Sequence, residues 1–211
     1  MSTVFDVFPT KEFIPSYREL LGLATTHVND FLRSYAIEIP IKLAVGLRSN
    51  DDESRVLPID LDGPCWWPQN QYAWFHVPDL AGGTDAYADP LGDLGTSILT
   101  EEIRGESAAA FGELIRQALL VGRYWSFRRS AGQPAIINIA YGIIAASLAQ
   151  LTDGFIFSID GAWDHRLLPA RPSDFLRWYF RPEMTEDEGK REWAHRCIQS
   201  LPDELQGVTG N

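Results

Sequence analysis

The longest apolar run in the sequence, Ala135 to Leu151, most constrains what the chain can fold into. Small or polar residues interrupt the run at Asn138, Gly142, Ser147 and Gln150. A membrane-spanning helix needs about 20 apolar residues, and this run is shorter. We therefore expect a helix that is buried inside a soluble domain and follows the turn Gly132-Gln133-Pro134.

Apolar residues at helical spacing predict further helices around this one. The predicted segments are Pro15 to Tyr35, Ser107 to Val121, Phe175 to Phe180 and Glu186 to Ser200. Ser173 is expected to cap the third of them, and Thr185 with Glu188 forms the capping-box pattern of the last. In Thr152-Asp153-Gly154, the glycine stands where glycine commonly ends a helix, just after the apolar run.

Alternating, β-branched and aromatic residues predict strands between these helices. The predicted strands are Ile39 to Leu47, Val56 to Leu61, Tyr72 to Val77, Tyr124 to Arg128 and Phe155 to Ile159. Ser49 to Ser54 is expected to be a turn that joins the first two strands as a hairpin. Pro58 is expected to place the second strand at a sheet edge or to add a bulge to it. This order predicts one α+β domain over residues 1–211, with a mainly antiparallel sheet packed against several helices. Residues 201–211 are expected to form a flexible tail.

Two segments rich in chain-breaking residues are predicted to be loops, Asp62 to Gln71 and Asp79 to Gly95. The second is long for a compact domain, and long loops are often functional. Its carboxylates are Asp79, Asp85, Asp89 and Asp93. They could supply oxygen ligands to Ca²⁺, but their spacing does not match the EF-hand pattern. A solvated or partner-binding loop is the better interpretation.

The chain has 29 acidic and 18 basic residues, which gives a net charge of −11. Phosphates attract clusters of Lys and Arg, so this charge disfavours binding to nucleic acid or to an anionic membrane. It favours a basic partner, although it would also serve solubility alone. The first residues lack the pattern of a secretory signal, and Cys65 and Cys197 give no reason to expect a disulfide. The expected location is therefore the cytoplasm.

The common sequence motifs for phosphate binding, dinucleotide binding, zinc proteolysis and serine hydrolysis do not occur. The best catalytic candidates are Asp160, Asp164 and His165, since a carboxylate beside an imidazole can perform acid–base chemistry. Asp160-Gly161 also has the composition of a turn. The histidines lack metal-ligand spacing. We expect a protein without catalysis, metal or cofactor, and keep a small hydrolase using these three residues as the alternative.

Two aromatic-rich segments allow more than one interpretation. Trp66 and Trp67 lie in a loop bounded by prolines, where exposed tryptophans would be typical anchors of a protein interface. The alternative is that both rings pack as a lid over the core. Arg123, Arg128 and Arg129 form a basic cluster among aromatic residues, a combination that can bind RNA. Ion pairs with the abundant carboxylates are the simpler interpretation.

Part of the C-terminal half, Tyr124 to Glu183, resembles a group of bacterial proteins that are associated with immunity against polymorphic or type VI secreted toxins. The residues that carry the resemblance are Gly132-Gln133-Pro134, Thr152-Asp153-Gly154, Asp160-Gly161-Ala162-Trp163 and Trp178-Tyr179-Phe180. The resemblance implies a cytoplasmic immunity protein that binds one protein toxin tightly and blocks its active site. An acidic protein suits a basic toxin, because opposite charges speed the encounter.

The contact surface is predicted from charge and expected exposure. The predicted partner-binding residues are Trp66, Trp67, Asp79, Asp85, Asp89 and Asp93.

Overall fold

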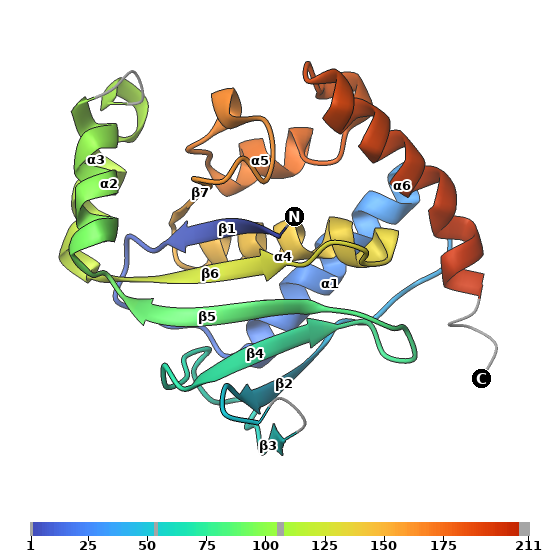
Figure 1. Cartoon of the computed structure of the whole chain (residues 1–211), viewed down its shortest axis with the longest axis horizontal. Helices are drawn as coiled ribbons and strands as arrows, with labels where there is room; N and C mark the ends of the chain where they lie inside the picture. Colours follow the sequence, from blue (N-terminus) through green and yellow to red (C-terminus); the bar gives the residue numbers. More distant parts are fainter. Residues whose placement is uncertain (1, 53–54, 105–107, 207–211) are drawn as a thin grey trace.

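The computed structural model describes residues 2–52, 55–104 and 108–206 of the chain. Within these residues the chain forms one seven-stranded sheet and a set of helices (Figure 1). The strands are β1 (Thr3–Phe8), β2 (Ala44–Ser49), β3 (Val56–Leu57), β4 (Gln71–His76), β5 (Thr84–Pro90), β6 (Arg123–Arg129) and β7 (Phe155–Phe157). The helices are α1 (Tyr17–Ser34), α2 (Asp93–Arg104), α3 (Ala108–Val121), α4 (Ala135–Leu151), α5 (Pro172–Trp178) and α6 (Glu188–Gln206), with short 3₁₀ helices η1 (His165–Leu167) and η2 (Pro182–Met184).

The strands follow the order β3-β2-β4-β5-β6-β1-β7, and every neighbouring pair is antiparallel. The predicted α+β class with an antiparallel sheet is therefore confirmed. The predicted hairpin of β2 and β3 forms, and β3 is a two-residue edge strand that ends just before Pro58. Residues 53–54 of the predicted turn lie outside the described part of the chain.

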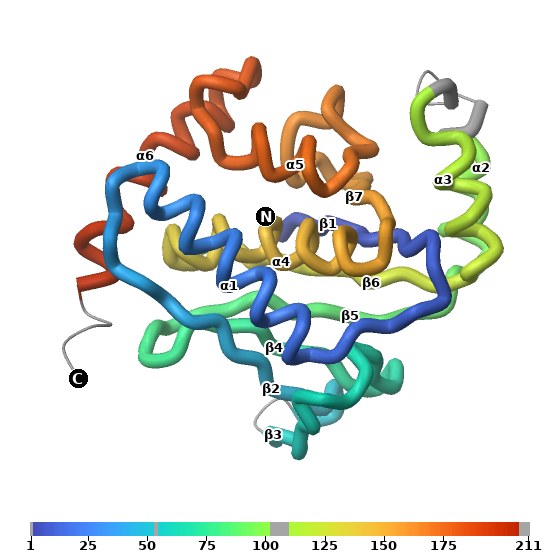
Figure 2. The backbone as a smooth tube through the Cα atoms, turned by 180° about the vertical axis from the view of Figure 1, so that it is seen from behind, coloured from blue at the N-terminus to red at the C-terminus, as the bar shows by residue number. Residues whose placement is uncertain are grey.

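The helices α1 and α4 cover one face of the sheet (Figures 1 and 2). Helix α4 is buried from Ala135 to Ala149, because it packs between the sheet and the helices α1, α5 and α6. The prediction of a buried helix is thus confirmed. None of the helices in the described residues is long and apolar enough to cross a membrane.

Contact between α4 and the end of α5 depends on a glycine. A Cβ atom at Gly142 would overlap the ring of Tyr179. The Tyr179 hydroxyl donates a 2.8 Å hydrogen bond to the carbonyl oxygen of Asn138, one turn earlier in α4. Gly142 therefore permits a helix-to-ring approach that no larger residue would allow.

Helix α1 starts where the sequence predicts it, and its N-terminus has a complete capping box. The Ser16 hydroxyl accepts a hydrogen bond from the Glu19 N–H, and the Glu19 side chain accepts one from the Ser16 N–H. Helix α3 also matches its prediction, although Ser107 lies outside the described residues. Helix α6 extends through Gln206, with Leu201 and Leu205 buried, so residues 201–206 are not a flexible tail. Residues 207–211 lie outside the described part.

Two predicted N-terminal caps are wrong. Ser173 does not cap α5, because the helix begins one residue earlier at Pro172, which fits a first helical position that needs no N–H donor. Thr185 does not cap α6, because its hydroxyl donates to the carbonyl of Arg181. Asp187 takes that role and accepts a 2.8 Å hydrogen bond from the Lys190 N–H.

The end of α4 also differs from its prediction. Asp153 adopts the left-handed conformation, with φ of +49°, in the position expected for glycine. Aspartate tolerates this region better than most residues. Gly154 is needed for a different reason, since a Cβ atom there would overlap the carbonyl of Phe8 in β1.

The prediction that Asp79 to Gly95 lacks regular structure is wrong. Thr84 to Pro90 is strand β5, paired on both sides with β4 and β6, and α2 begins at Asp93. Pairing on both sides overrides the low strand propensity of alanine and aspartate. Ala86 and Ala88 are buried on the helix-covered face of the sheet. The N-terminal strand β1 and the helix α2 were not predicted.

Candidate functional site

The second face of the sheet is left largely open by the helices. Along β6, Trp125 and Phe127 are fully buried on the side of α4, whereas Tyr124 and Ser126 point to the opposite face. Side chains of a strand alternate in this way because successive residues point to opposite sides. The hairpin of α2 and α3 stands at one end of the open face (Figure 1). The open face and this hairpin together form a groove.

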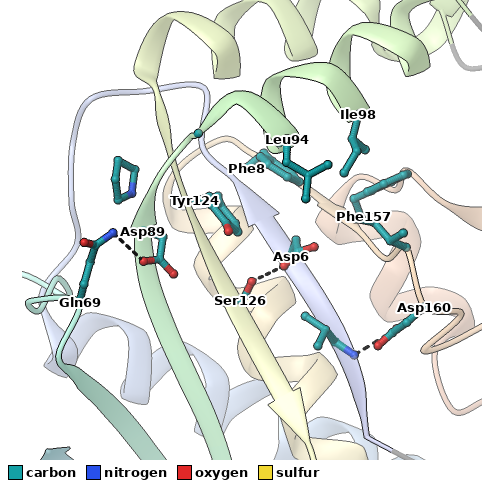
Figure 3. A pocket seen from close by; sticks show the side chains of 15 residues that line it. Asp6, Phe8, Gln69, Asp89, Leu94, Ile98, Tyr124, Ser126, Phe157 and Asp160 are labelled. Atoms are coloured by element: carbon teal, nitrogen blue, oxygen red, sulfur yellow. Dashed lines mark hydrogen bonds between the residues drawn. The ribbon is translucent and has the colours of Figure 1, made fainter. Parts of the chain in front are cut away.

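The groove has a volume of about 640 Å³ and is lined from β1, β5, β6, β7 and α2 (Figure 3). The strand register places its floor residues in rows. One row runs across Asp89, Tyr124 and Phe8, and the next runs across Ser126, Asp6 and Phe157. Chain segments far apart in sequence thus supply one continuous surface.

Asp6 is the most unusual group in the groove. Its side chain is buried, with an exposed fraction of 8%, and it accepts a hydrogen bond from the Ser126 hydroxyl. Among the described residues no Lys, Arg or His forms an ion pair with it. Burial raises the pKa of Asp6 from 3.8 to about 6; the Ser126 hydrogen bond lowers it, and nearby Asp160 adds to the rise. A carboxylate without a cationic partner therefore lies at the groove floor.

Tyr124 lies between two carboxylates of the groove. Its ring stacks on Phe8, with centroids 5.6 Å apart. Burial raises the pKa of the Tyr124 hydroxyl, and the charges of Asp6 and Asp89 raise it further. Asp89 accepts a 3.1 Å hydrogen bond from the Gln69 amide, which fixes it at the groove wall. The ring thus has acidic groups on both sides.

Asp160 adds a third carboxylate at the other end of the groove. It follows β7, and its Oδ1 accepts hydrogen bonds from the Val4 N–H at 3.2 Å and from the Ser158 hydroxyl at 3.0 Å. These bonds tie the segment after β7 to β1. The lining residues that the structure describes include no Lys, Arg or His, so the charged groups of the groove are all carboxylates.

The rim of the groove is apolar and exposed. Leu94, in the first turn of α2, is 76% exposed, and Ile159, after β7, is 65% exposed. Ile98 lies one turn after Leu94 and also lines the groove. Single exposed apolar residues are common on proteins, but here two of them flank one acidic groove. Apolar residues around a polar centre are typical of a surface that contacts another molecule.

On the other half of the open sheet face, Arg48 and Arg128 each contact a neighbouring side chain. The Arg48 guanidinium lies 4.8 Å from the centre of the Trp74 ring, and Arg128 forms an ion pair with the buried Asp85. The prediction that the basic cluster forms ion pairs with carboxylates is confirmed for Arg128. Arg129 instead donates to Asn138 and Thr3, and Arg123 donates to backbone carbonyls near the N-terminus.

The two predicted tryptophans contribute to the core. Trp67 is 2% exposed and stacks on Tyr17 of α1, so it cannot contact a partner. Trp66 is half-buried and packs edge-on against Trp125, whose Nε1 donates a 2.9 Å hydrogen bond to the Cys65 carbonyl. The lid interpretation describes both rings better than the interface interpretation.

The four predicted aspartates do not form one acidic loop. Asp79 lies between β4 and β5, and Asp93 starts α2. Asp85 is buried and neutralised by Arg128. Of the four, only Asp89 lines the groove. Within the described residues no group of His, Cys, Asp and Glu side chains is arranged to hold a metal ion.

The candidate catalytic residues are not assembled into a site. Asp164 is buried and pairs with Arg166 at 2.6 Å, and the Arg166 hydrogen bond is the main cause that lowers the pKa of Asp164. His165 is exposed, and no hydrogen bond or ion pair joins it to Asp160 or Asp164 among the described contacts. The two cysteines, Cys65 and Cys197, are both buried and free.

Sequence reasoning missed Asp6, Tyr124 and Ser126 as groove residues. The sequence contains one signal for Asp6. If Val4 to Phe8 is a strand, successive side chains point to opposite faces, which places Asp6 on the face opposite Phe5 and Val7. No protein-family model, curated protein or solved structure matches the chain.

Proposed function

We propose that this chain is an immunity-type binding protein that neutralises a basic protein toxin by covering its active site. The groove on the open sheet face is the proposed contact surface. The observation that carries the proposal is a groove with three carboxylates, no basic lining residue among those described, and the exposed Leu94 and Ile159 at its rim.

Charge and sequence resemblance support the same function. The net charge of −11 would steer a basic partner towards the protein, and such steering raises association rates. The resemblance of Tyr124 to Glu183 to immunity proteins is a further, sequence-based reason. Binding energy at protein interfaces concentrates in a few central residues surrounded by contacts that exclude water. An acidic centre with apolar neighbours suits that arrangement.

Co-expression with a candidate basic toxin, encoded by a gene adjacent to this one, tests the proposal. We expect the wild-type chain to restore growth and to copurify with the toxin as one complex on size exclusion. Asp89→Lys and Leu94→Asp should each weaken the complex at least tenfold. Glu38→Lys is the matched control, because Glu38 is exposed, lies in the segment after α1 and changes the net charge by the same amount as Asp89→Lys.

Two results would reject this function. One is the absence of both protection and a complex. The other is equal binding by the wild type, Asp89→Lys, Leu94→Asp and Glu38→Lys, which would reject the groove as the contact surface.

A second candidate, an acid–base enzyme, has one observation in its favour. Asp6 has a pKa raised to about 6 beside a second carboxylate, Asp160, and such pairs occur in catalytic sites. This candidate predicts that Asp6→Asn abolishes protection while the toxin complex, measured by copurification, stays intact. If Asp6→Asn abolishes protection and the toxin complex together, the result would favour a binding protein without catalysis.

A further inference from the structure

The acidic groove has features that select one kind of side chain. Resting on the proposed function, we propose that it binds a single arginine of the partner protein, with the guanidinium over Tyr124 between Asp6 and Asp89. The partner's apolar residues beside that arginine would contact Leu94 and Ile159.

The spacing of the carboxylates argues for an extended cation. Asp89 is on β5 and Asp6 is on β1, with β6 between them. Neighbouring strands lie about 4.8 Å apart, and Asp6 also lies one row further along the sheet than Asp89, so the two backbones are separated by more than roughly 10 Å. The described residues offer no cluster that could hold a metal ion. A planar group with donors on several edges can reach both carboxylates, whereas a compact ion would serve one of them.

Asp6 supplies the strongest reason for a cation. The side chain is more than nine-tenths buried, its one hydrogen bond comes from a neutral hydroxyl, and no described cation pairs with it. Burying an unpaired carboxylate is unfavourable, because the protein interior solvates charge poorly. A cation that enters the groove would remove this cost, which a neutral or anionic group would not do.

The aromatic floor favours arginine over lysine. The Tyr124 ring stacks on Phe8 of the neighbouring strand and lies between Asp89 of its own row and Asp6 of the next row. A guanidinium stacks on aromatic faces and donates five N–H groups in its plane. The lysine ammonium is a compact point charge and does neither. Ile98 and Phe157 add apolar walls that suit the methylene groups of an arginine side chain.

The probe that tests this inference is N-acetyl-arginine N-methylamide, titrated into the isotopically labelled chain at pH 7.5 and low salt. We expect saturable amide shifts in the NMR spectrum at Val4, Leu94, Tyr124 and Ser126. N-acetyl-citrulline N-methylamide, its neutral counterpart, should cause no saturable shift. N-acetyl-lysine N-methylamide should bind at least fivefold more weakly.

Two variants distinguish binding of the probe in the groove from attraction by the net negative charge of the protein. Asp6→Asn should weaken binding of the arginine probe at least tenfold, and Glu38→Gln should leave it unchanged. Equal binding of the citrulline or lysine probe, or no saturable binding of arginine, would overturn the inference. If the arginine probe fails while the toxin complex still depends on Asp89 and Leu94, the proposed function stands without an arginine anchor. If the probe binds but no toxin complex forms, the inference stands and the proposed function fails.

Discussion

The hydroxyl of Tyr179 at the end of α5 and the carbonyl oxygen of Asn138 inside α4 are joined by a 2.8 Å hydrogen bond. Tyr179 is fully surrounded by aromatic side chains, including Phe5, Phe175 and Trp163. This bond joins the end of α5 to the central buried helix, and the Ala135 and Ile136 N–H groups of the same helix donate to Glu204 of α6.

Gly142→Ala should destabilise the protein, because the added methyl group would overlap the Tyr179 ring. Overpacking of this kind costs about 1–3 kcal/mol. Chemical denaturation gives the change in the free energy of unfolding. Gly22→Ala in α1 is the control, since no atom lies within 4 Å of the added Cβ, and alanine there should stabilise by up to about 1 kcal/mol. Equal effects of the two variants would contradict the close packing at Gly142.

Tyr179→Phe should lower the free energy of unfolding by about 1 kcal/mol, because it removes one hydrogen bond and leaves the ring packing in place. Tyr72→Phe is the comparison, because it removes a hydroxyl from another buried ring. Tyr72 lies in β4 and packs ring to ring with Tyr87. Denaturation curves of the two variants measure the difference. An unchanged midpoint for Tyr179→Phe would mean that the bond contributes nothing.

Asp6→Asn should raise stability at neutral pH. The pKa of Asp6 is raised from 3.8 to about 6 in the folded chain, so ionisation of Asp6 destabilises the folded state above pH 6. This pKa shift lowers the free energy of unfolding by roughly 3 kcal/mol at most. The stabilisation by Asp6→Asn should be largest above pH 6 and should fade as the pH drops from about 6 to about 4, where wild-type Asp6 becomes protonated in both states. Unfolding by urea across this range measures it, and a difference independent of pH would contradict the assigned environment.

Trp67→Ala should cost about 3–5 kcal/mol, since it removes a fully buried ring that stacks on Tyr17. Leu120→Ala is the control, because Leu120 is 87% exposed in α3 and its truncation should change stability by less than about 0.5 kcal/mol. Thermal unfolding separates the two outcomes. A mild effect of Trp67→Ala would return this residue to the candidates for partner contact.

The sequence predicts the elements whose signals are local. Helices α1 and α4 follow from apolar spacing, and β4 and β6 follow from aromatic and β-branched residues. Strand β5 could not be predicted in this way, because it contains two alanines, two aspartates and a proline, and its strand conformation depends on pairing with β4 and β6. Strand β1 depends even more on distant partners, since it lies between β6 and β7.

The groove was predicted less well than the fold for a related reason. Counting carboxylates in Asp79 to Gly95 identified Asp89 but also gave weight to Asp85, whose charge Arg128 neutralises from another strand. Asp6 was overlooked because its burial and its proximity to Asp160 arise only when β1 and β7 pair. The alternation from Val4 to Phe8 indicates which face of the strand Asp6 occupies, but its burial and its neighbours belong to the assembled sheet.

The alternation along β1, β5 and β6 has a consequence for how this protein can change over time. Asp6, Asp89 and Tyr124 face the groove, while their neighbours Phe5, Ala88 and Trp125 are buried in the core. Substitutions in the first set change the surface of the groove, whereas substitutions in the second set disturb the core. Related sequences should then diverge at every second position of these strands.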